Sequence, residues 1–183
     1  MELIFKAIVV FTACQRLIEL FIAKSNEKHI TGLGGKIIAE KNYIFMVLLH
    51  TTWLASILYC AFFMDYQIDP ALFYGSLVFF VFGQFLRITA ISTLGKRWST
   101  RIVILPEAPA IKKGIYNYFR HPNYLGVVLE IAALPLMASF YGIALFFTLA
   151  NFVILYFRIR LEEHCLIEHN KYREVFNIQG KNV

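Results

Sequence analysis

Charged side chains are scarce in this chain. Asp, Glu, Lys and Arg together account for 16% of its 183 residues, whereas hydrophobic residues account for 58% and the mean hydropathy is +0.60. Water-soluble domains carry about 25% charged residues, so this composition excludes an ordinary soluble globular protein. The 18 phenylalanines and 10 tyrosines instead suit a membrane protein with aromatic anchors at the lipid surface.

Cysteines and glycine-rich loops are also sparse. The three cysteines, Cys14, Cys60 and Cys165, lie far apart and match no metal-binding or disulfide spacing. We therefore interpret them as small apolar core residues and predict no metal site. No G-x-G-x-x-G loop is present, since the pair Gly34-Gly35 stands alone in a basic segment, and this excludes a soluble enzyme of the Rossmann type.

Long apolar runs are what the sequence does contain. The runs at 3–23, 43–64 and 71–94 each approach the roughly 20 residues that a helix needs to cross about 30 Å of hydrocarbon. A fourth run, 124–157, holds a single charge and is too long for one crossing. Because Pro135 and the break at 139–142 interrupt it, we expect a tight helical hairpin there. The sequence thus predicts an all-α integral membrane protein of about five transmembrane helices, forming one domain over 1–183.

Basic residues predict the orientation. Lys and Arg concentrate in segments 24–41 and 95–120 and after residue 158, whereas the link 65–70 has two aspartates and no basic residue. The positive-inside rule then places the N-terminus outside, with both basic loops and the C-terminus in the cytoplasm, and we expect the plasma membrane as the location. The net charge of +6 fits contact with anionic membrane lipids. Nucleic acid is not an expected partner, because no nucleic-acid-binding motif accompanies these dispersed charges.

Two polar stretches flank the expected hairpin. One is GIYNYFRHPNYLG at 114–126 and the other is RIRLEE at 158–163. A tight hairpin brings its two ends together, so we expect these stretches and the following residues to meet at the cytoplasmic face. Together they supply Arg120, His121, Arg158, Arg160, Glu162, Glu163, His164 and Tyr172. Charges of both signs beside aromatic rings suit a zwitterionic, nucleotide-like ligand, although each residue alone also fits a helix end or an interfacial aromatic belt.

The motif residues carry a family resemblance. The pattern G-x-Y-x-x-x-R-H-P-x-Y-x-G at 114–126 resembles the signature of the isoprenylcysteine carboxyl methyltransferase family. The later R-x-x-x-E-E-x-x-L at 158–166 and the upstream L-G-x-x-W-S at 94–99 are similar to that family too, so the resemblance covers roughly residues 90–175, about half of the chain.

The N-terminal half resembles a small bacterial branch of this family. It does so through QRLIEL at 15–20 and MVLLHTTW at 46–53. That branch is linked to type III polyketide synthases and methylates alkylpyrones or related phenolic lipids. The spacing from Glu163 to Tyr172 is about two residues shorter than in the eukaryotic enzymes, so the acceptor need not be a prenylated cysteine.

The resemblance implies the cofactor and the roles of the motif residues. It implies methyl transfer from S-adenosylmethionine to a lipid-like acceptor, with 95–183 as the cofactor-binding part and 1–94 as a three-helix part. Arg158, Arg160 and Glu163 are the expected catalytic residues, the arginines favouring an anionic acceptor. The expected residues of a cytoplasmic cofactor cleft are Tyr116, Arg120, His121, Pro122, Tyr124, Gly126, Glu162, Glu163 and Tyr172.

Five further polar residues lie within the apolar runs, namely Arg16, Glu19, His50, Arg87 and Glu130. Arg16 and Glu19 are spaced i, i+3 and either pair structurally or lie near the acceptor. Ionisable groups at membrane depth are functional hypotheses by default, but His50 equally suits an interhelical hydrogen bond. Arg87 either snorkels or meets an anionic ligand, and Glu130 is one turn beyond Gly126, so it is expected to face the same cleft.

Two other functions stay open at this point. Distantly similar NADPH-dependent sterol or enone reductases end in a related R-H-P-N-Y-x-G element, although they usually place Glu after the glycine, where Val127 stands here. A non-catalytic membrane subunit is the second alternative. The sequence identifies neither the acceptor nor the oligomeric state.

Overall fold

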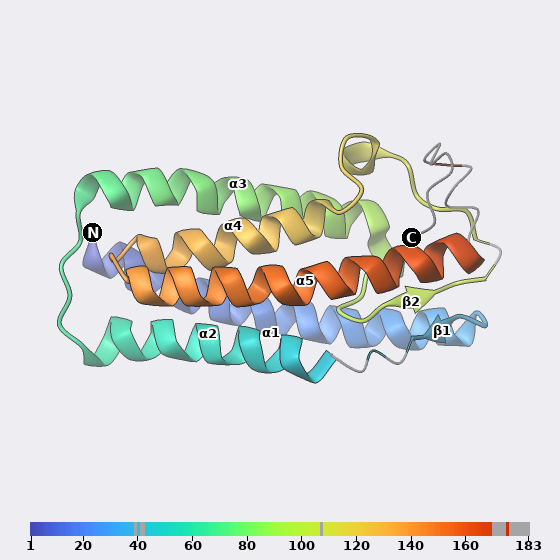
Figure 1. Ribbon diagram of the computed structural model, residues 1–183, viewed down its shortest axis with the longest axis horizontal. Helices are drawn as coiled ribbons and strands as arrows, with labels where there is room; N and C mark the ends of the chain where they lie inside the picture. The colour runs from blue at the N-terminus through green and yellow to red at the C-terminus, as the bar shows by residue number, and fades with distance from the viewer. Residues whose placement is uncertain (39, 41–42, 107, 170–174, 176–183) are drawn as a thin grey trace.

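Five long helices run side by side along the molecule (Figure 1). This computed structural model describes residues 1–38, 40, 43–106, 108–169 and 175. The helices are α1 (Glu2–Gly32), α2 (Tyr43–Phe63), α3 (Pro70–Leu94), α4 (Pro122–Leu136) and α5 (Tyr141–His169). The predicted mostly helical fold is confirmed, and the fourth apolar run forms the expected hairpin of α4 and α5.

Three of the helical segments in the described part of the chain are long and apolar enough to cross a membrane. They are α2, the segment Pro70–Arg97 and the segment Tyr141–Glu168. Helix α4 has 15 residues, which span about 22 Å at roughly 1.5 Å per residue. Helix α1 has 31 residues but includes Lys6, Arg16 and Glu19, which lower its hydropathy. Five crossings and the orientation of the termini therefore stay predictions.

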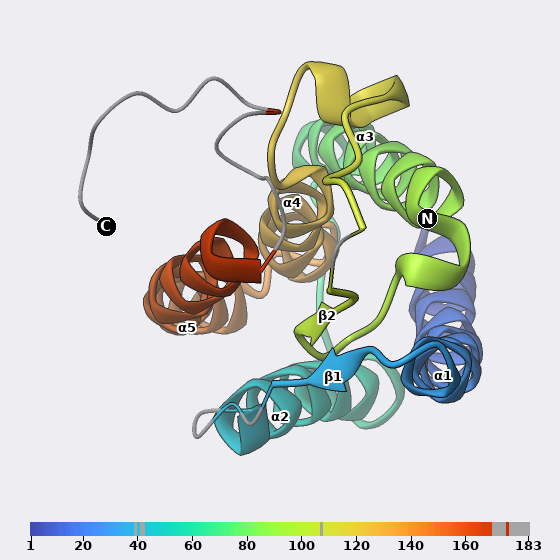
Figure 2. The same cartoon turned by 90° about the vertical axis from the view of Figure 1, so that its right-hand side faces the viewer.

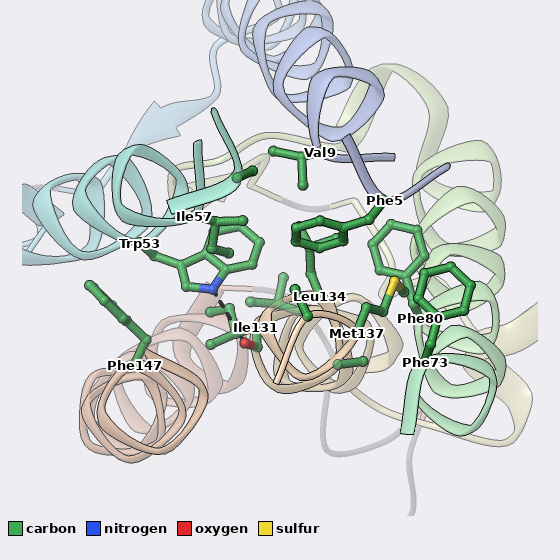
Figure 3. Close-up of a cluster of buried hydrophobic side chains, with 14 of the residues drawn as sticks. Phe5, Val9, Trp53, Ile57, Phe73, Phe80, Ile131, Leu134, Met137 and Phe147 are labelled. Carbon is green, nitrogen blue, oxygen red and sulfur yellow. Dashed lines mark hydrogen bonds between the residues drawn. The ribbon is translucent and has the colours of Figure 1, made fainter. Parts of the chain in front are cut away.

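A buried apolar core joins the helices in the half of the bundle nearest the α4–α5 turn. Figure 3 shows its largest members pointing toward one another from all five helices. The fully or nearly buried side chains include Phe5, Val9, Trp53, Ile57, Phe73, Phe80, Ile131, Leu134, Met137 and Phe147. This packing ties α4, the shortest helix, into the centre of the bundle.

Pro135 creates a polar gap inside α4 that α2 closes. Proline has no backbone N–H, so the carbonyl of Ile131, four residues earlier, lacks its helical partner. The indole Nε1 of Trp53 donates to that carbonyl over 3.3 Å. A buried carbonyl is thus satisfied by a side chain of another helix, as membrane burial requires.

Helices α3 and α4 approach closely at two glycines. A Cβ atom on Gly126 would lie 2.7 Å from the carbonyl oxygen of Gly83 and 2.6 Å from Cγ of Arg87. A Cβ on Gly83 would in turn lie 3.0 Å from the carbonyl oxygen of Gly126. Small residues at such crossings let membrane helices pack backbone to backbone. Gly126, expected in the cofactor cleft, thus lies in a helix–helix contact.

The basic segments gather at the end of the molecule opposite the N-terminus (Figure 1). There β1 (Lys36–Ile37) pairs antiparallel with β2 (Val103–Ile104), with Lys36 opposite Ile104. The 3₁₀ helices η1 (Gly95–Arg97) and η2 (Gly114–Asn117) lie in the same region. Figure 2 looks onto this end and shows both strands lying across it. The segment after α1 therefore covers the end of the bundle at which the motif residues lie.

Candidate functional site

A cavity of about 570 Å³ opens beneath this covered end and is lined by residues of all five helices. Such a volume is typical of small-molecule sites. One part of its wall is polar and comes from the motif region: Tyr116, Arg120, His121, Asn123, Tyr124, Arg158 and Glu162. The other part is mostly apolar and comes from α1 and α2: Ala13, Leu17, Leu20, Val47, Leu54, Ala55 and Leu58. A single cavity therefore joins a polar compartment to an apolar one.

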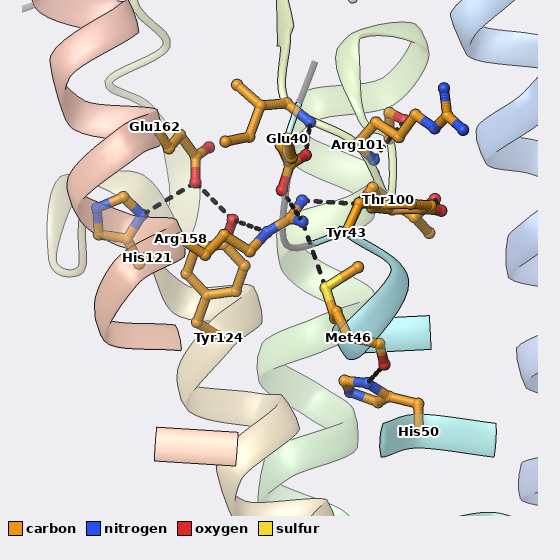
Figure 4. A network of polar contacts seen from close by, with 12 residues as sticks. Glu40, Tyr43, Met46, His50, Thr100, Arg101, His121, Tyr124, Arg158 and Glu162 are labelled. Carbon is orange, nitrogen blue, oxygen red and sulfur yellow. Dashed lines mark hydrogen bonds and ion pairs between the residues drawn. The ribbon is translucent and has the colours of Figure 1, made fainter. Parts of the chain in front are cut away.

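Arg158 connects three separate segments of the polar compartment (Figure 4). Its Nε donates to the hydroxyl of Tyr124 over 2.9 Å and its Nη2 to the carbonyl of Thr100 over 2.7 Å. Its Nη1 pairs with Glu40 over 2.7 Å. The guanidinium is buried and charge-compensated, so Arg158 holds the wall of the cavity together.

The two flanking stretches of the hairpin meet as predicted. The Tyr124 hydroxyl donates to Glu162 over 2.5 Å, and His121 Nε2 lies 3.0 Å from a carboxylate oxygen of Glu163. Arg120 pairs with that same oxygen over 2.9 Å. The rings of His121 and Tyr124 stack with centroids 5.4 Å apart. Two carboxylates of α5 therefore hold the aromatic groups at the start of α4 in fixed orientations.

Several expected site residues lie outside the cavity wall. Arg160 is exposed and its guanidinium lies over the Tyr156 ring, 5.3 Å from the centroid. Glu163 contacts His121, which lines the cavity, but is not itself a lining residue. Pro122 is buried at the first turn of α4. His164 faces Glu168 over 3.4 Å on the exposed side of α5. Tyr172 lies outside the described residues.

Four charged side chains form a compact buried network between α1, α3 and α4. Arg16 pairs with Glu19 over 2.6 Å and also with Glu130. Arg87 pairs with Glu19 and lies 3.3 Å from Glu130. The structural pairing of Arg16 with Glu19 is confirmed, whereas snorkelling of Arg87 is wrong because its side chain is buried and paired inside the bundle. Arg16, Glu19 and Arg87 also line the cavity, so a role of these residues near the acceptor or another ligand stays a prediction. Two positive and two negative charges cancel, which makes burial at membrane depth tolerable.

His50 lines the cavity from α2 but makes no interhelical hydrogen bond among the described residues. Its Nδ1 lies 2.8 Å from the carbonyl oxygen of Met46, one turn earlier in the same helix. The alternative of an interhelical bond is therefore wrong for the described part of the chain. Met46 in turn contacts Nη1 of Arg158 through its sulfur at 3.3 Å, so one turn of α2 links His50 to the polar compartment.

Sequence reasoning missed Glu40, which reaches a residue of the cavity wall, Arg158, from the loop after α1. Besides pairing with Arg158, it accepts a hydrogen bond from the backbone N–H of Ile102 over 2.9 Å. The pair joins residues 118 positions apart. No local pattern connects them, because the β1–β2 pairing and the hydrogen bond from Ile38 N–H to the carbonyl of Ile102 bring the loop to this place.

Trp98 and Asn123 were also missed as site residues, and both line the cavity. The indole Nε1 of Trp98 and the side-chain Oδ1 of Asn123 are buried without a hydrogen-bond partner in the described part of the chain. Unpaired buried polar groups are costly and uncommon. Both residues belong to the cavity wall, and a polar ligand there would supply the partners that this donor and this acceptor lack.

Comparison with known proteins agrees with the motif. A model of the isoprenylcysteine carboxyl methyltransferase (ICMT) family matches residues 76–168, slightly more than half of the chain. The chain belongs to this family. It is also 30% identical over 166 residues to the uncharacterized protein YpbQ of Bacillus subtilis (strain 168), covering 91% of this chain and 98% of that protein. No solved structure matches the chain.

Membership in the ICMT family implies a membrane-bound methyltransferase that uses S-adenosylmethionine. The matched region contains both stretches that flank the hairpin and most of α3. The Glu162 carboxylate and the stacked rings of His121 and Tyr124, all in the cavity wall, fit an amino-acid and nucleoside ligand of this kind. Neither comparison supports the expected link to polyketide synthases or alkylpyrones.

Proposed function

We propose that this protein transfers a methyl group from S-adenosylmethionine to an oxygen atom of a hydrophobic acceptor at the membrane. The observation that carries this proposal is the single cavity with a polar compartment at the family motif and an apolar compartment between α1 and α2. The polar compartment suits a water-soluble cofactor, and the apolar compartment suits an apolar acceptor. One cavity would hold both reactants in contact, which is the main requirement for a transfer from an already activated donor.

The polar compartment is the proposed cofactor site. When bound, the cofactor supplies a methyl group that its sulfonium already activates. The stacked rings of His121 and Tyr124 offer an aromatic face, and Glu162 offers negative charge for a cationic group. Trp98 and Asn123, also in the wall, carry a buried donor and a buried acceptor that have no partner among the described residues.

Arg158 is proposed as a positioning residue. All three of its nitrogens are engaged with Tyr124, Thr100 and the Glu40 carboxylate. Its contribution is to fix the Tyr124 ring and to hold the loop with Glu40 over the cavity. Arg160, whose guanidinium lies on Tyr156, is not part of the proposed machinery.

The acceptor is proposed to be a lipid-like molecule with one oxygen nucleophile and an apolar tail. Phenolic lipids, alkylpyrones and prenylcysteine-like carboxylates all have this form. Lining residues of α1 and α2 recur at helical spacing, at Ala13, Leu17 and Leu20 and at Val47, Leu54 and Leu58. These apolar side chains give the tail a surface worth roughly 25 cal/mol for each Å² that it buries, and Arg16, Glu19 and His50 line the same cavity beside them.

The test begins with the cofactor. Purified protein in detergent should gain thermal stability from S-adenosylhomocysteine and not from NADP⁺, whereas a reductase would respond in the opposite way. Transfer of labelled methyl groups is then measured with acceptors from the three chemical classes. A protein that binds S-adenosylhomocysteine but transfers no label to lipid extracts would fit the non-catalytic alternative instead.

A further inference from the structure

His50 stands where the two compartments of the cavity join. On one side of it, Met46 contacts Arg158 and so belongs to the polar compartment. On the other side, Leu54 and Leu58 continue the cavity wall along the same face of α2. A reacting oxygen at the head of an apolar tail would lie at this boundary.

The hydrogen bond of His50 within its own helix fixes the position of its proton. The carbonyl oxygen of Met46 only accepts hydrogen bonds, so Nδ1, at 2.8 Å, must carry the hydrogen. In the neutral ring the other nitrogen, Nε2, then keeps a free lone pair. No partner for Nε2 is found among the described residues, which leaves it available to accept a proton.

The arginines around His50 are each compensated by a carboxylate. Arg16, Arg87 and Arg158 come from three other helices and line the same cavity as His50. Their carboxylate partners Glu19, Glu130 and Glu40 are engaged with these arginines. Glu19, the carboxylate that lines the same region, also accepts from Gln15 over 2.9 Å. His50 is thus the group in this part of the described wall with a basic lone pair that the protein does not use.

We infer that His50 is the general base that removes the hydroxyl proton of the acceptor during methyl transfer. This inference rests on the proposed function. The acceptor oxygen forms its bond to the methyl carbon as its O–H bond breaks and the proton moves to Nε2. The methyl–sulfur bond breaks and its electron pair stays on sulfur, giving S-adenosylhomocysteine, a methyl ether and a His50 imidazolium that later returns its proton to solvent.

With His50 as the general base, the expected acceptor is a weakly acidic hydroxyl compound. An acceptor that reacts through a carboxylate is already ionised and needs no base. Its negative charge would also be repelled by the lone pair on Nε2 of His50. The nearby arginines offer such an anion little compensation, because each is already paired with a glutamate. A phenol, with a pKa of about 10, is protonated at neutral pH and requires the base.

The test compares two acceptors of different acidity in wild type and His50→Gln, a variant that keeps a hydrogen-bonding side chain but cannot take up a proton. With a long-chain 4-alkylphenol, kcat should fall by about 100-fold or more. With a long-chain 4-hydroxy-2-pyrone, whose enol is ionised at neutral pH, kcat should fall by no more than about threefold. Equal losses on both acceptors, or no loss on the phenol, would overturn the role of His50. Thr52→Val is the control, since that hydroxyl bonds back to Leu48 on the exposed side of α2.

A second measurement needs no cofactor and no turnover. In protein with ¹⁵N-labelled histidine rings, the His50 signals, assigned by their loss in His50→Gln, should show a neutral ring protonated at Nδ1. Addition of the alkylphenol should shift the Nε2 resonance. A ring protonated at Nε2, or one that does not respond to the phenol, would contradict the inference even if methyl transfer is observed. Failure to bind S-adenosylhomocysteine would count against the proposed function itself.

Discussion

Arg158 of α5 and Glu40 of the loop after α1 form a buried ion pair at 2.7 Å, across 118 residues of sequence. Their side chains are 7% and 6% exposed. The pair fastens the loop over the polar compartment, and the same guanidinium orients Tyr124 on the opposite wall. Arg158 therefore links the loop with Glu40 to Tyr124 of the family motif.

Replacing Glu40 by Gln should destabilise the protein by about 3–5 kcal/mol, because the guanidinium of Arg158 would stay buried without its counter-charge. Thermal unfolding in detergent measures the effect. Glu168→Gln is the matched control, since that carboxylate is 55% exposed and should change stability little. An equal effect of the two substitutions would show that the Glu40–Arg158 pair is not a structural fastening.

Arg158→Lys and Arg160→Lys make the same chemical change two positions apart on one helix. A lysine at 158 has one nitrogen where the arginine engages three partners, and these groups cannot all be reached by a single ammonium. We expect methyl transfer to fall by about 100-fold in Arg158→Lys. Arg160→Lys should keep its rate within about threefold, since Arg160 only covers the Tyr156 ring. Similar losses of methyl transfer in both variants would show that Arg160 also takes part in the reaction.

Gly126→Ala should separate α3 from α4. The added Cβ would meet a backbone oxygen of Gly83 at 2.7 Å, and a backbone atom cannot move aside as a side chain can. We expect a loss of about 1–3 kcal/mol, as for other overpacked sites. Gly75→Ala, on α3, is the control, because a Cβ atom at that position would have no neighbour within 4 Å among the described residues. That substitution should be neutral or slightly stabilising, since alanine favours a helix over glycine.

The sequence predicted the parts of the molecule that local patterns control. Apolar runs located the five helices, Pro135 and the 139–142 break located the hairpin, and the hairpin brought 114–126 to 158–163. Glu40 escaped prediction because strands of two residues, as in β1 and β2, leave no periodic pattern. Arg160 was assigned to the site because it is close to Arg158 in sequence. Residues two apart on a helix face different directions, which explains why only Arg158 lines the cavity.

The sequence indicated a single ion pair among the intramembrane charges, whereas four of them form one network in the structure. The i, i+3 spacing of Arg16 and Glu19 indicated that they pair, and the structure contains this pair. No pattern linked it to Arg87 on α3 or Glu130 on α4, since helix packing alone brings them together. A network with balanced charges explains how four ionisable residues can be buried together within apolar runs.

Substituting each of the two tryptophans of the chain tests whether its indole N–H binds the ligand or stabilises the fold. Trp98 Nε1 has no partner among the described residues, so Trp98→Phe removes no hydrogen bond of the described fold. If this donor binds the cofactor, affinity for S-adenosylhomocysteine should fall by about tenfold, which corresponds to a hydrogen bond of roughly 1.4 kcal/mol. The melting temperature of the protein without ligand should fall less than in Trp53→Phe, because both changes remove the same buried volume but only Trp53 also loses a hydrogen bond of the described fold.

Trp53→Phe should give the opposite result. The Trp53 indole donates to the Ile131 carbonyl that Pro135 leaves without a helical partner. Loss of the indole leaves this buried acceptor without a hydrogen bond, which costs about 1–3 kcal/mol of stability. We expect a lower melting temperature and unchanged affinity for S-adenosylhomocysteine, measured by titration calorimetry on the folded fraction. If Trp98→Phe instead lowers stability as much as Trp53→Phe and leaves affinity unchanged, the unpaired indole belongs to the fold and the cofactor lies elsewhere in the cavity. The contrast between the two variants therefore locates the cofactor by its hydrogen bonds, independently of any acceptor.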